Sequence, residues 1–394
     1  MDGYISWAAA RAAQADALGD AIVRLRAQVE RAQGNGALTG PGPVFLGVGA
    51  SLAATSAAVW ELRARGIDAW RLGAGDTPLP LPLSEHPIIG ISQSGRSTET
   101  IAALDSVAPA LRLAVVNNSA SPLAELVDLR IDLGDIPDSY ASTIGYTATV
   151  VALAMIAEAW DGGSIDPGWA AFPDVFRAFD ERLMLEVEHA AALFVGAPSS
   201  DFVGGGASAG SAEAGALLFR EVARIPSSAM STRQYLHGAM ESAGAGVHVL
   251  FGGARELQVG RMLSASGHPV VLVTTEADAA ELGLGSGLGS GLGSVGGAGF
   301  GGGSGLGGGS GLGGGSGLGG GSGLGGGSGL GGGVENGSIA VITLPAGSVH
   351  QRSILEALVL QVLVERVSGL LGVDIEEFVF ENDDTKVPAP QPTT

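Results

Sequence analysis

The stretch Gly90-Ile91-Ser92-Gln93-Ser94-Gly95-Arg96-Ser97-Thr98-Glu99-Thr100 joins a short apolar strand to the start of a helix. The apolar run 87–91 predicts the strand, and we expect the helix to begin near Thr98. Backbone N–H groups at a helix N-terminus converge on an anion, hydroxyls add donors, and Gly95 permits close backbone approach. A simple N-capping turn is the alternative, because serine and threonine also cap helices without a ligand. Three hydroxyls and an amide exceed what one cap needs, which favours a phosphate-binding loop.

Composition limits what this loop can belong to. The chain has 394 residues, 45% hydrophobic, no cysteine and a formal net charge of −20. Its length suits two domains, each burying a core of its own. The lack of cysteine excludes disulfides, thiolate metal sites and a cysteine nucleophile, and fits a cytoplasmic protein. The acidic balance argues against nucleic acid or membrane partners. Neither a signal pattern nor a membrane-spanning run is present, which predicts a soluble protein.

The hydrophobic pattern of the first half alternates between strands and helices, after one or two helices within 7–32. Strands are expected at 44–49, 69–72, 87–92, 113–117 and 129–133, and helices at 51–65, 98–107, 122–127 and 143–160. Such alternation indicates a parallel sheet covered on both faces, with ligands beyond the carboxyl ends of its strands. Ser51 follows the first strand as the 92–97 loop follows a later one, so both loops lie at one edge.

An internal repeat predicts a second domain of the same kind. Phe45-Leu46-Gly47-Val48-Gly49-Ala50-Ser51 reads closely like Phe202-Val203-Gly204-Gly205-Gly206-Ala207-Ser208, so the second copy starts near Asp201. A helix over 173–195 connects the copies; strands at 247–251, 269–274 and 338–344 and a helix over 348–367 follow. Where the first copy has Ser-Gln-Ser-Gly, the second has Phe251-Gly252-Gly253-Ala254-Arg255. Without the hydroxyls, the second copy is not expected to bind phosphate.

The segment 283–333 consists mostly of Gly-Leu-Gly-Gly-Gly-Ser repeats. It cannot bury enough surface to offset its ordering entropy, so we predict a disordered, expanded surface loop inside the second domain. The domain boundaries expected from these patterns are N-terminal helices in 1–40, a first domain in 41–162, a second in 173–373 and a C-terminal tail in 374–394.

Three motifs, Gly49-Ala50-Ser51, Ser92-Gln93-Ser94-Gly95 and Ala141-Ser142-Thr143, resemble in their order the sugar isomerase (SIS) domain. The doubled arrangement resembles the isomerase half of glucosamine-6-phosphate synthase and its free-standing relatives, the amino-sugar-phosphate isomerases, deaminases and fructosamine deglycases. The resemblance covers nearly everything except the N-terminal helices and the glycine-rich insert. It implies two flavodoxin-like α/β/α domains with parallel sheets, a homodimer, and a phosphorylated sugar or amino sugar as ligand.

The resemblance also implies roles for residues of the first domain. Five would hold the substrate's phosphate, and two would lie against the sugar. The phosphate-binding set is Ser51, Ser92, Gln93, Ser94 and Ser97, and the sugar-binding pair is Ser142 and Thr143. Ser97 stands where the synthase has a threonine, and Ile144 stands where a lysine usually follows Ala-Ser-Thr.

In the second domain, Gly215-Ala216-Leu217-Leu218-Phe219-Arg220-Glu221 resembles the family's Gly-Ala-Leu-Lys-Leu-Lys-Glu helix, with Leu218 in place of a lysine. The resemblance makes Glu221 the acid/base that moves a proton between sugar C1 and C2. In Tyr235-Leu236-His237-Gly238, it makes His237 the ring-opening group, contributed across the dimer interface. In Asp383-Asp384-Thr385-Lys386, it makes Lys386 the lysine that reaches the open-chain sugar.

Each catalytic candidate also has a structural alternative. Glu221 could pair with Arg220 or Arg224 at the surface, His237 could be structural, and Lys386 could belong to a solvated tail. A catalytic Glu221 would need partial desolvation to raise its pKa, and Glu213 on the same predicted helix could share its site. The remaining histidines lack metal-ligand spacing, so no metal site and no cofactor are expected; they are His86, His189, His248, His268 and His350.

The expected function is aldose–ketose isomerisation of the glucosamine-6-phosphate/fructose-6-phosphate type, coupled to loss or gain of ammonia. The synthase's amide-transferring domain, with its N-terminal cysteine, has no counterpart here, so no glutaminase activity is expected. Two other functions stay open. One is a regulator that binds a sugar phosphate without chemistry, and the other is a deglycase of phosphorylated fructosyl-amino acids.

Overall fold

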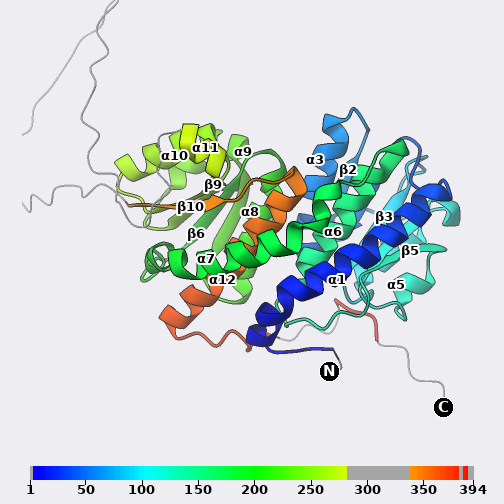
Figure 1. Cartoon of the computed structure of the whole chain (residues 1–394), viewed down its shortest axis with the longest axis horizontal. Helices are drawn as coiled ribbons and strands as arrows, with labels where there is room; N and C mark the ends of the chain where they lie inside the picture. The colour runs from blue at the N-terminus through cyan, green and yellow to red at the C-terminus, as the bar shows by residue number, and fades with distance from the viewer. Residues whose placement is uncertain (1–2, 282–337, 381–384, 389–394) are drawn as a thin grey trace, which may run out of the picture.

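A computed structural model of the chain describes residues 3–281, 338–380 and 385–388. It contains two five-stranded sheets, side by side in Figure 1, with orders β2-β1-β3-β4-β5 and β10-β9-β8-β6-β7. Their paired strands are all parallel. The predicted α/β class with two flavodoxin-like units is therefore confirmed. The predicted disordered segment 283–333 lies outside the described residues.

The strands of the first sheet are β1 (Val44–Gly47), β2 (Trp70–Gly73), β3 (Ile88–Ser92), β4 (Arg112–Val116) and β5 (Leu129–Asp132). Those of the second are β6 (Ser200–Gly204), β7 (Ser227–Ser231), β8 (Val247–Phe251), β9 (Val270–Thr275) and β10 (Ile339–Leu344). The sequence pattern gives no sign of β7, because its serine-rich segment lacks an apolar run. It takes an edge position, where one neighbouring strand is enough.

The helices of the first half are α1 (Trp7–Gly34), α2 (Ala50–Ala53), α3 (Ser56–Ala64), α4 (Thr98–Asp105), α5 (Pro122–Glu125) and α6 (Ile144–Ala159). Those of the second half are α7 (Phe172–Ala192), α8 (Ala209–Glu221), α9 (Thr232–Leu236), α10 (Ala254–Ala265), α11 (Glu276–Glu281) and α12 (Val349–Leu371). Short 3-10 turns lie at Ala74–Asp76, Pro109–Leu111, Trp160–Gly162, Pro167–Ala170, Gly206–Ser208 and Ala239–Ser242. Among the described helices, none combines the length and apolar character needed to cross a membrane.

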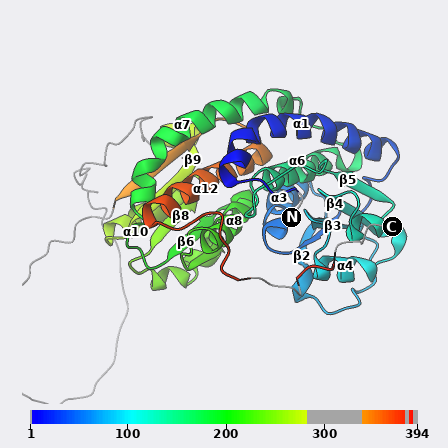
Figure 2. The ribbon, with the colours of Figure 1, turned by 90° about the horizontal axis from the view of Figure 1, so that it is seen from below.

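Each sheet separates two layers of helices, because successive strand side chains point to opposite faces. In β4, Leu113 and Val115 join the core formed with α1 and α6, whereas Ala114 and Val116 pack with α4 and α5. Helix α6 is buried along almost its whole length, which explains why its sequence is apolar on every side. In Figure 2, α6 and α12 lie between the sheets and an outermost layer formed by α1 and α7.

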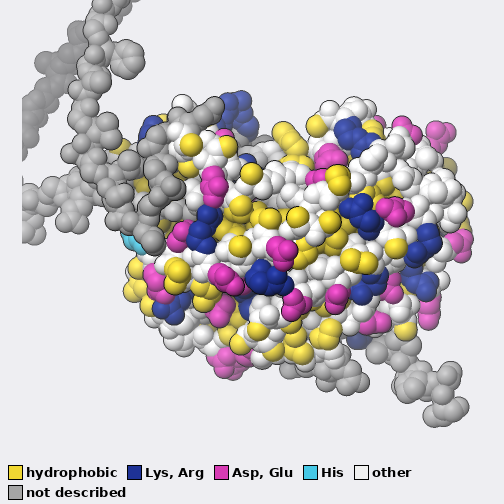
Figure 3. All heavy atoms as spheres, viewed as in Figure 1, with side chains coloured by type: hydrophobic (Ala, Val, Ile, Leu, Met, Phe, Trp, Pro, Cys, Tyr) yellow, Lys and Arg dark blue, Asp and Glu magenta, His cyan; other side chains and the backbone are white. Residues whose placement is uncertain are grey.

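The inner layer is shared by the two units. One continuous core joins α1, α6, α7, α8 and α12 to the inner faces of both sheets, so that Phe45 of β1 and Phe202 of β6 belong to it together. This differs from the expectation of two separate cores, which holds only for the outer layers. On the face drawn in Figure 3, acidic and basic side chains are interspersed, with apolar side chains between them. The shared core fixes α6, α8 and α12 against one another, and the candidate site lies among these helices.

Candidate active site

The loop between β3 and α4 is folded as a tight turn that only glycine can complete. Gly95 has φ +64°, and a Cβ there would lie 1.9 Å from Oγ of Ser121. The Gly95 N–H donates to the Ser92 carbonyl at 3.0 Å, and the Leu123 N–H donates to the Gly95 carbonyl at 3.0 Å. Within the loop, Oγ of Ser92 and Oγ of Ser97 are hydrogen-bonded at 2.9 Å. The predicted hydroxyls are therefore held on a rigid turn at the carboxyl edge of the first sheet.

Asp138 organises the polar groups between this loop and α6. Its buried carboxylate accepts hydrogen bonds from the N–H groups of four residues, at distances of 2.9 to 3.2 Å; they are Ser139, Thr143, Ile144 and Gly145. An anion at a helix N-terminus is favourable, because the unpaired N–H groups and the helix dipole both attract it. Asp138 therefore caps α6 from within the chain.

Three predicted site residues also donate to Asp138. Oδ2 accepts from Nε2 of Gln93 at 3.1 Å and from Oγ of Ser142 at 2.7 Å, while Oδ1 accepts from Oγ1 of Thr143 at 2.6 Å. The shared carboxylate thus connects the 92–97 loop to the start of α6. Thr143 is fully buried, whereas Ser142 also lines the cavity described below.

A small, half-open cavity of about 30 Å³ lies where α6, α8 and α12 meet. Its polar groups are Ser142, Tyr146, Glu221 and Gln361, and its apolar wall is formed by Ala50, Ala214, Leu217, Leu218, Ala357 and Leu360. Residues four apart share one face of a helix, which places Leu217 with Glu221 on α8. The cavity brings Glu221 and Ser142, two of the predicted site residues, to one place.

Glu221 is the titratable group that stands out in this cavity. Its half-buried side chain has no hydrogen bond or ion pair within the described part of the chain, and burial raises its pKa from 4.5 to about 7. Arg220 and Arg224, the partners that a structural role of Glu221 would need, bind other groups. Nε of Arg220 donates to the Ser227 carbonyl at 2.6 Å, and Arg224 pairs with Glu377 at 3.2 Å. A carboxyl group with a pKa near neutrality can both accept and donate a proton at physiological pH.

Three other candidate residues, Ser51, Glu213 and His237, do not line this cavity. Ser51 is half-buried and follows Ala50, which lines the cavity. Glu213 does not line the cavity and pairs with Arg71 of β2. His237 is exposed at the end of α9 and is absent from the described cavity lining. Within one chain, the structure therefore does not bring His237 to Glu221.

The C-terminal segment 385–388 lies against the loop between β3 and α4. Lys386 forms an isolated antiparallel bridge with Ser97, and the Val387 N–H donates to the Arg96 carbonyl at 2.9 Å. Nε of Arg96 returns a hydrogen bond to the Val387 carbonyl at 2.7 Å, and the Thr98 N–H donates to the Thr385 carbonyl at 3.2 Å. Lys386 is thus exposed beside the loop on an anchored backbone.

Sequence reasoning missed three polar residues of this site: Asp138, Tyr146 and Gln361. Asp138 lies six residues before the first residue of α6, beyond the usual N-cap spacing, so no local pattern singled it out. Tyr146 lies four residues after Ser142, and burial raises its pKa above the usual tyrosine range. Gln361 is a buried amide between apolar neighbours in α12, and its Nε2 donates to the Thr143 carbonyl at 3.3 Å.

No protein-family model matches the chain, and no curated protein sequence matches it. Solved structures do. The C-terminal domain of glucosamine-fructose-6-phosphate aminotransferase from Francisella tularensis matches with a TM-score of 0.69 and 18% identity, over 95% of this chain and 98% of that one. Tagatose-6-phosphate ketose/aldose isomerase from Escherichia coli matches with a TM-score of 0.62 and 15% identity, over 94% of this chain and 95% of that one.

A third match is glucosamine-6-phosphate deaminase from Thermotoga maritima, with a TM-score of 0.61 and 15% identity, over 92% of this chain and 96% of that one. These likenesses extend over nearly the whole length of each partner. They show that the chain has the doubled sugar isomerase (SIS) fold that its motifs implied. At such identities, the likeness concerns the fold, and the function has to be argued from the site.

Proposed function

We propose that the chain is a sugar-phosphate isomerase that converts between an amino-sugar phosphate and a ketose phosphate, of the glucosamine-6-phosphate/fructose-6-phosphate type, with release or uptake of ammonia. The observation that carries the proposal is Glu221, an unpaired carboxyl with a pKa of about 7 in the cavity between α6, α8 and α12. The names of the matched structures supply the substrate class, since each refers to a hexose 6-phosphate or its amino form.

The reaction needs one base on one face of the open-chain sugar. In the direction of ammonia loss, C2 of the open-chain amino sugar loses a proton and C1 gains one, so a single carboxylate can carry out both transfers; water then hydrolyses the resulting C2 imine to the ketose phosphate and ammonia. A group with a pKa of about 7 is half ionised at neutral pH, which suits Glu221 to both halves of the exchange. Ser142 and Tyr146 line the same cavity and can donate hydrogen bonds to sugar oxygens.

Phosphate binding is assigned to the five predicted loop residues, with the 92–97 loop as the main anchor. The rigid turn at Gly95 supports this role, because it fixes the hydroxyls before a ligand arrives. His237 is assigned to ring opening in a second copy's site, which agrees with its exposed position outside the cavity of its own chain. Lys386 is assigned to the open-chain sugar, next to the loop its backbone contacts.

A regulator that binds a sugar phosphate without chemistry is the second candidate. It is favoured by the apolar wall of the cavity, where Leu218 stands at the position of a lysine in the synthase. A deglycase of phosphorylated fructosyl-amino acids would use the same phosphate loop and base. These candidates differ from the main proposal in turnover and in substrate, so one set of assays separates them.

The test follows ammonia and fructose 6-phosphate released from glucosamine 6-phosphate by the purified protein. Glu221→Gln is expected to lower turnover by about 10²–10⁴-fold, the usual contribution of a general base, while the affinity for fructose 6-phosphate stays close to that of the parent. Glu241→Gln, an exposed glutamate outside the cavity, is the matched control and should keep full activity. Parent-like turnover in Glu221→Gln would contradict the assignment. Binding without turnover in the parent would favour the regulator.

A further inference from the structure

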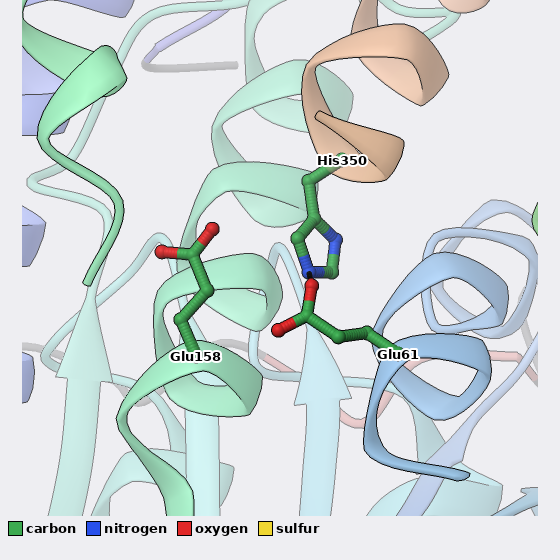
Figure 4. A group of neighbouring side chains, drawn as sticks. All are labelled: Glu61, Glu158 and His350. Atoms are coloured by element: carbon green, nitrogen blue, oxygen red, sulfur yellow. Dashed lines mark ion pairs between the residues drawn. The ribbon is translucent and has the colours of Figure 1, made fainter. Parts of the chain in front are cut away.

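Three helices bring a histidine and two glutamates together outside the cavity. Glu61 comes from α3, Glu158 from the end of α6 and His350 from the first turn of α12, and Figure 4 shows their side chains converging. One ligand atom from each lies within 4.8 Å of the others. Along α6, Glu158 is twelve residues beyond Tyr146, or about 18 Å at 1.5 Å per residue. This cluster is therefore separate from the candidate active site.

His350 is buried without the hydrogen bonds that a buried imidazole needs. Its side chain is fully enclosed; Nδ1 has no hydrogen-bond partner among the described residues, and Nε2 has only its contact with Glu61. Nε2 lies 2.5 Å from Oε2 of Glu61 as an ion-pair contact, and the ring points toward that carboxylate in Figure 4. Buried polar groups are almost always satisfied, and a buried imidazole with one free nitrogen, held only by a carboxylate and with a second buried carboxylate beside it, forms a group that a cation would satisfy.

The Glu158 carboxylate is already oriented by its surroundings. It is 6% exposed, and it accepts hydrogen bonds from Nε1 of Trp169 at 3.2 and 3.0 Å and from the Asp166 N–H at 3.0 Å. Hydrogen-bonded outer partners of this kind hold the carboxylate ligands of metal ions in a fixed orientation. Arg65, the nearby cation, donates to the backbone carbonyls of Glu158 and Trp160.

We propose that Glu61, Glu158 and His350 bind one divalent transition-metal ion of the zinc type. An imidazole with two carboxylates is a donor set that zinc accepts, and the two negative charges compensate the charge of the ion. Glu61 is 21% exposed, so water can reach the fourth coordination position. Bonds of about 2.0–2.1 Å in a tetrahedral arrangement separate ligand atoms by about 3.3 Å. Oε2 of Glu61 therefore moves back from Nε2 of His350 when the metal binds.

Such an ion would connect the two units of the fold. Glu61 and Glu158 belong to helices of the first unit, whereas His350 belongs to α12 of the second. Helices α6 and α12 also carry Tyr146 and Gln361 in the cavity, so the ion would hold together the helices that build the active site. Its role is structural, and the proposal does not depend on the isomerase assignment.

The competing explanation is a buried ion pair between His350 and Glu61 with no metal. Metal titration separates the two. The full-length chain, free of any histidine tag, is stripped with EDTA and titrated with Co²⁺, whose visible absorption reports four-coordinate binding, and Zn²⁺ is then added as competitor. One equivalent of Co²⁺ is expected to bind and to be displaced by Zn²⁺. The loaded protein should melt a few degrees above the stripped protein, because the ion binds only the folded state.

Variants locate the site. His350→Gln is expected to weaken Co²⁺ binding at least tenfold, whereas His189→Gln, an exposed histidine on α7, should leave it unchanged. If His350→Gln does not fold, Glu61→Gln decides instead, because that side chain is partly exposed and its replacement has the same shape. Absence of stoichiometric binding by the parent, or equal binding by the parent and Glu61→Gln, would overturn the proposal and leave the ion pair.

Discussion

The two sheets have equivalent strand orders, yet the loops after their central strands β3 and β8 differ in one decisive respect. After β3, the fifth residue beyond the strand is the half-buried Ser97, whose hydroxyl is hydrogen-bonded to that of buried Ser92, and no carboxylate occupies this position. After β8, the fifth residue is Glu256, whose carboxylate is 6% exposed. Oε1 of Glu256 accepts from Oγ1 of Thr232 at 2.7 Å, and Oε2 accepts from the Gly253 N–H at 3.0 Å. The second loop therefore contains its own anion, whereas the first has a hydroxyl at that position.

With phosphate assigned to the first loop, as we propose, this difference explains why the repeated fold would keep one ligand site. A carboxylate from the chain uses the donors that an external phosphate would need, and it does so without the entropy cost of binding a ligand. The same contrast separates two glutamates. Glu256 is hydrogen-bonded and structural, while Glu221 has no partner within the described residues and a pKa raised by burial. The unpaired carboxyl is the one available for chemistry.

The largest expected effect is at the turn of the first loop. Gly95→Ala places a methyl group 1.9 Å from Oγ of Ser121 at φ +64°, so we expect a loss of about 3 kcal/mol or more in unfolding free energy. Fructose 6-phosphate binding should be lost as well, measured by calorimetry beside urea unfolding. Gly253→Ala in the second loop is the matched control, since its Cβ would lie 3.1 Å from the end of the Asp278 side chain. Equal loss of ligand affinity in both variants would remove the distinction between the loops.

The second effect concerns the pH dependence of stability. The carboxyl of Glu221 has a pKa of about 7 in the folded state against 4.5 otherwise, so the folded protein binds this proton more tightly. The resulting stabilisation, up to about 3 kcal/mol, is complete below pH 4.5 and is lost as the pH rises through 7. Urea unfolding from about pH 5 to about pH 8 should show this loss in the parent and in Glu241→Gln. In Glu221→Gln it should be absent, and a parent-like slope there would assign the proton to another group.

The third effect tests the internal anion of the second loop. Glu256→Gln replaces an acceptor with an amide that cannot accept from both Thr232 and the Gly253 N–H, so stability should fall by about 1–3 kcal/mol. Fructose 6-phosphate affinity should not change, because the ligand is assigned to the other sheet. A changed affinity with unchanged stability would place ligand contacts at the second loop.

The smallest effect is the removal of one loop hydroxyl. Ser94 lies in the first loop, and its Oγ accepts from the Arg96 N–H at 3.3 Å. Ser94→Ala should weaken fructose 6-phosphate binding by about 1 kcal/mol, or about fivefold in Kd, with turnover at saturating substrate nearly intact. Ser242→Ala, an exposed serine outside both loops, is the control. An unchanged Kd in Ser94→Ala would remove Ser94 from the phosphate site.

The sequence predicted the strands and the turn of the 92–97 loop because both are local, and phosphate binding by that loop stays a prediction. Apolar runs bounded by turn residues marked β1, β3 and β8, and the cluster of hydroxyls around Gly95 marked the loop. The strand β7 escaped notice because an edge strand can fold without an apolar run. The common inner core was also unpredictable, since periodicity reveals which face of α6 or α12 is buried but not the element against which it packs.

The polar connections of the site were harder to predict than its motifs. Asp138 acts through a turn that places its carboxylate against N–H groups up to seven residues later, and no spacing rule singles it out. Glu61, Glu158 and His350 come from segments nearly 300 residues apart, so their convergence appears only in the folded chain. Glu221, by contrast, was found through the likeness of its helix to a family motif, and the structure adds the burial that raises its pKa.

The proton transfer assigned to Glu221 can be observed directly by exchange. The protein is incubated with fructose 6-phosphate in D₂O, and deuterium entering the carbon adjacent to the carbonyl is followed by NMR, beside calorimetric binding of the same ligand. The parent is expected to exchange this position, while Glu221→Gln should bind the ligand with similar affinity and exchange at least a hundredfold more slowly. Exchange at the parent rate in Glu221→Gln, or no exchange by a parent that binds the ligand, would contradict the assignment of Glu221 as the base.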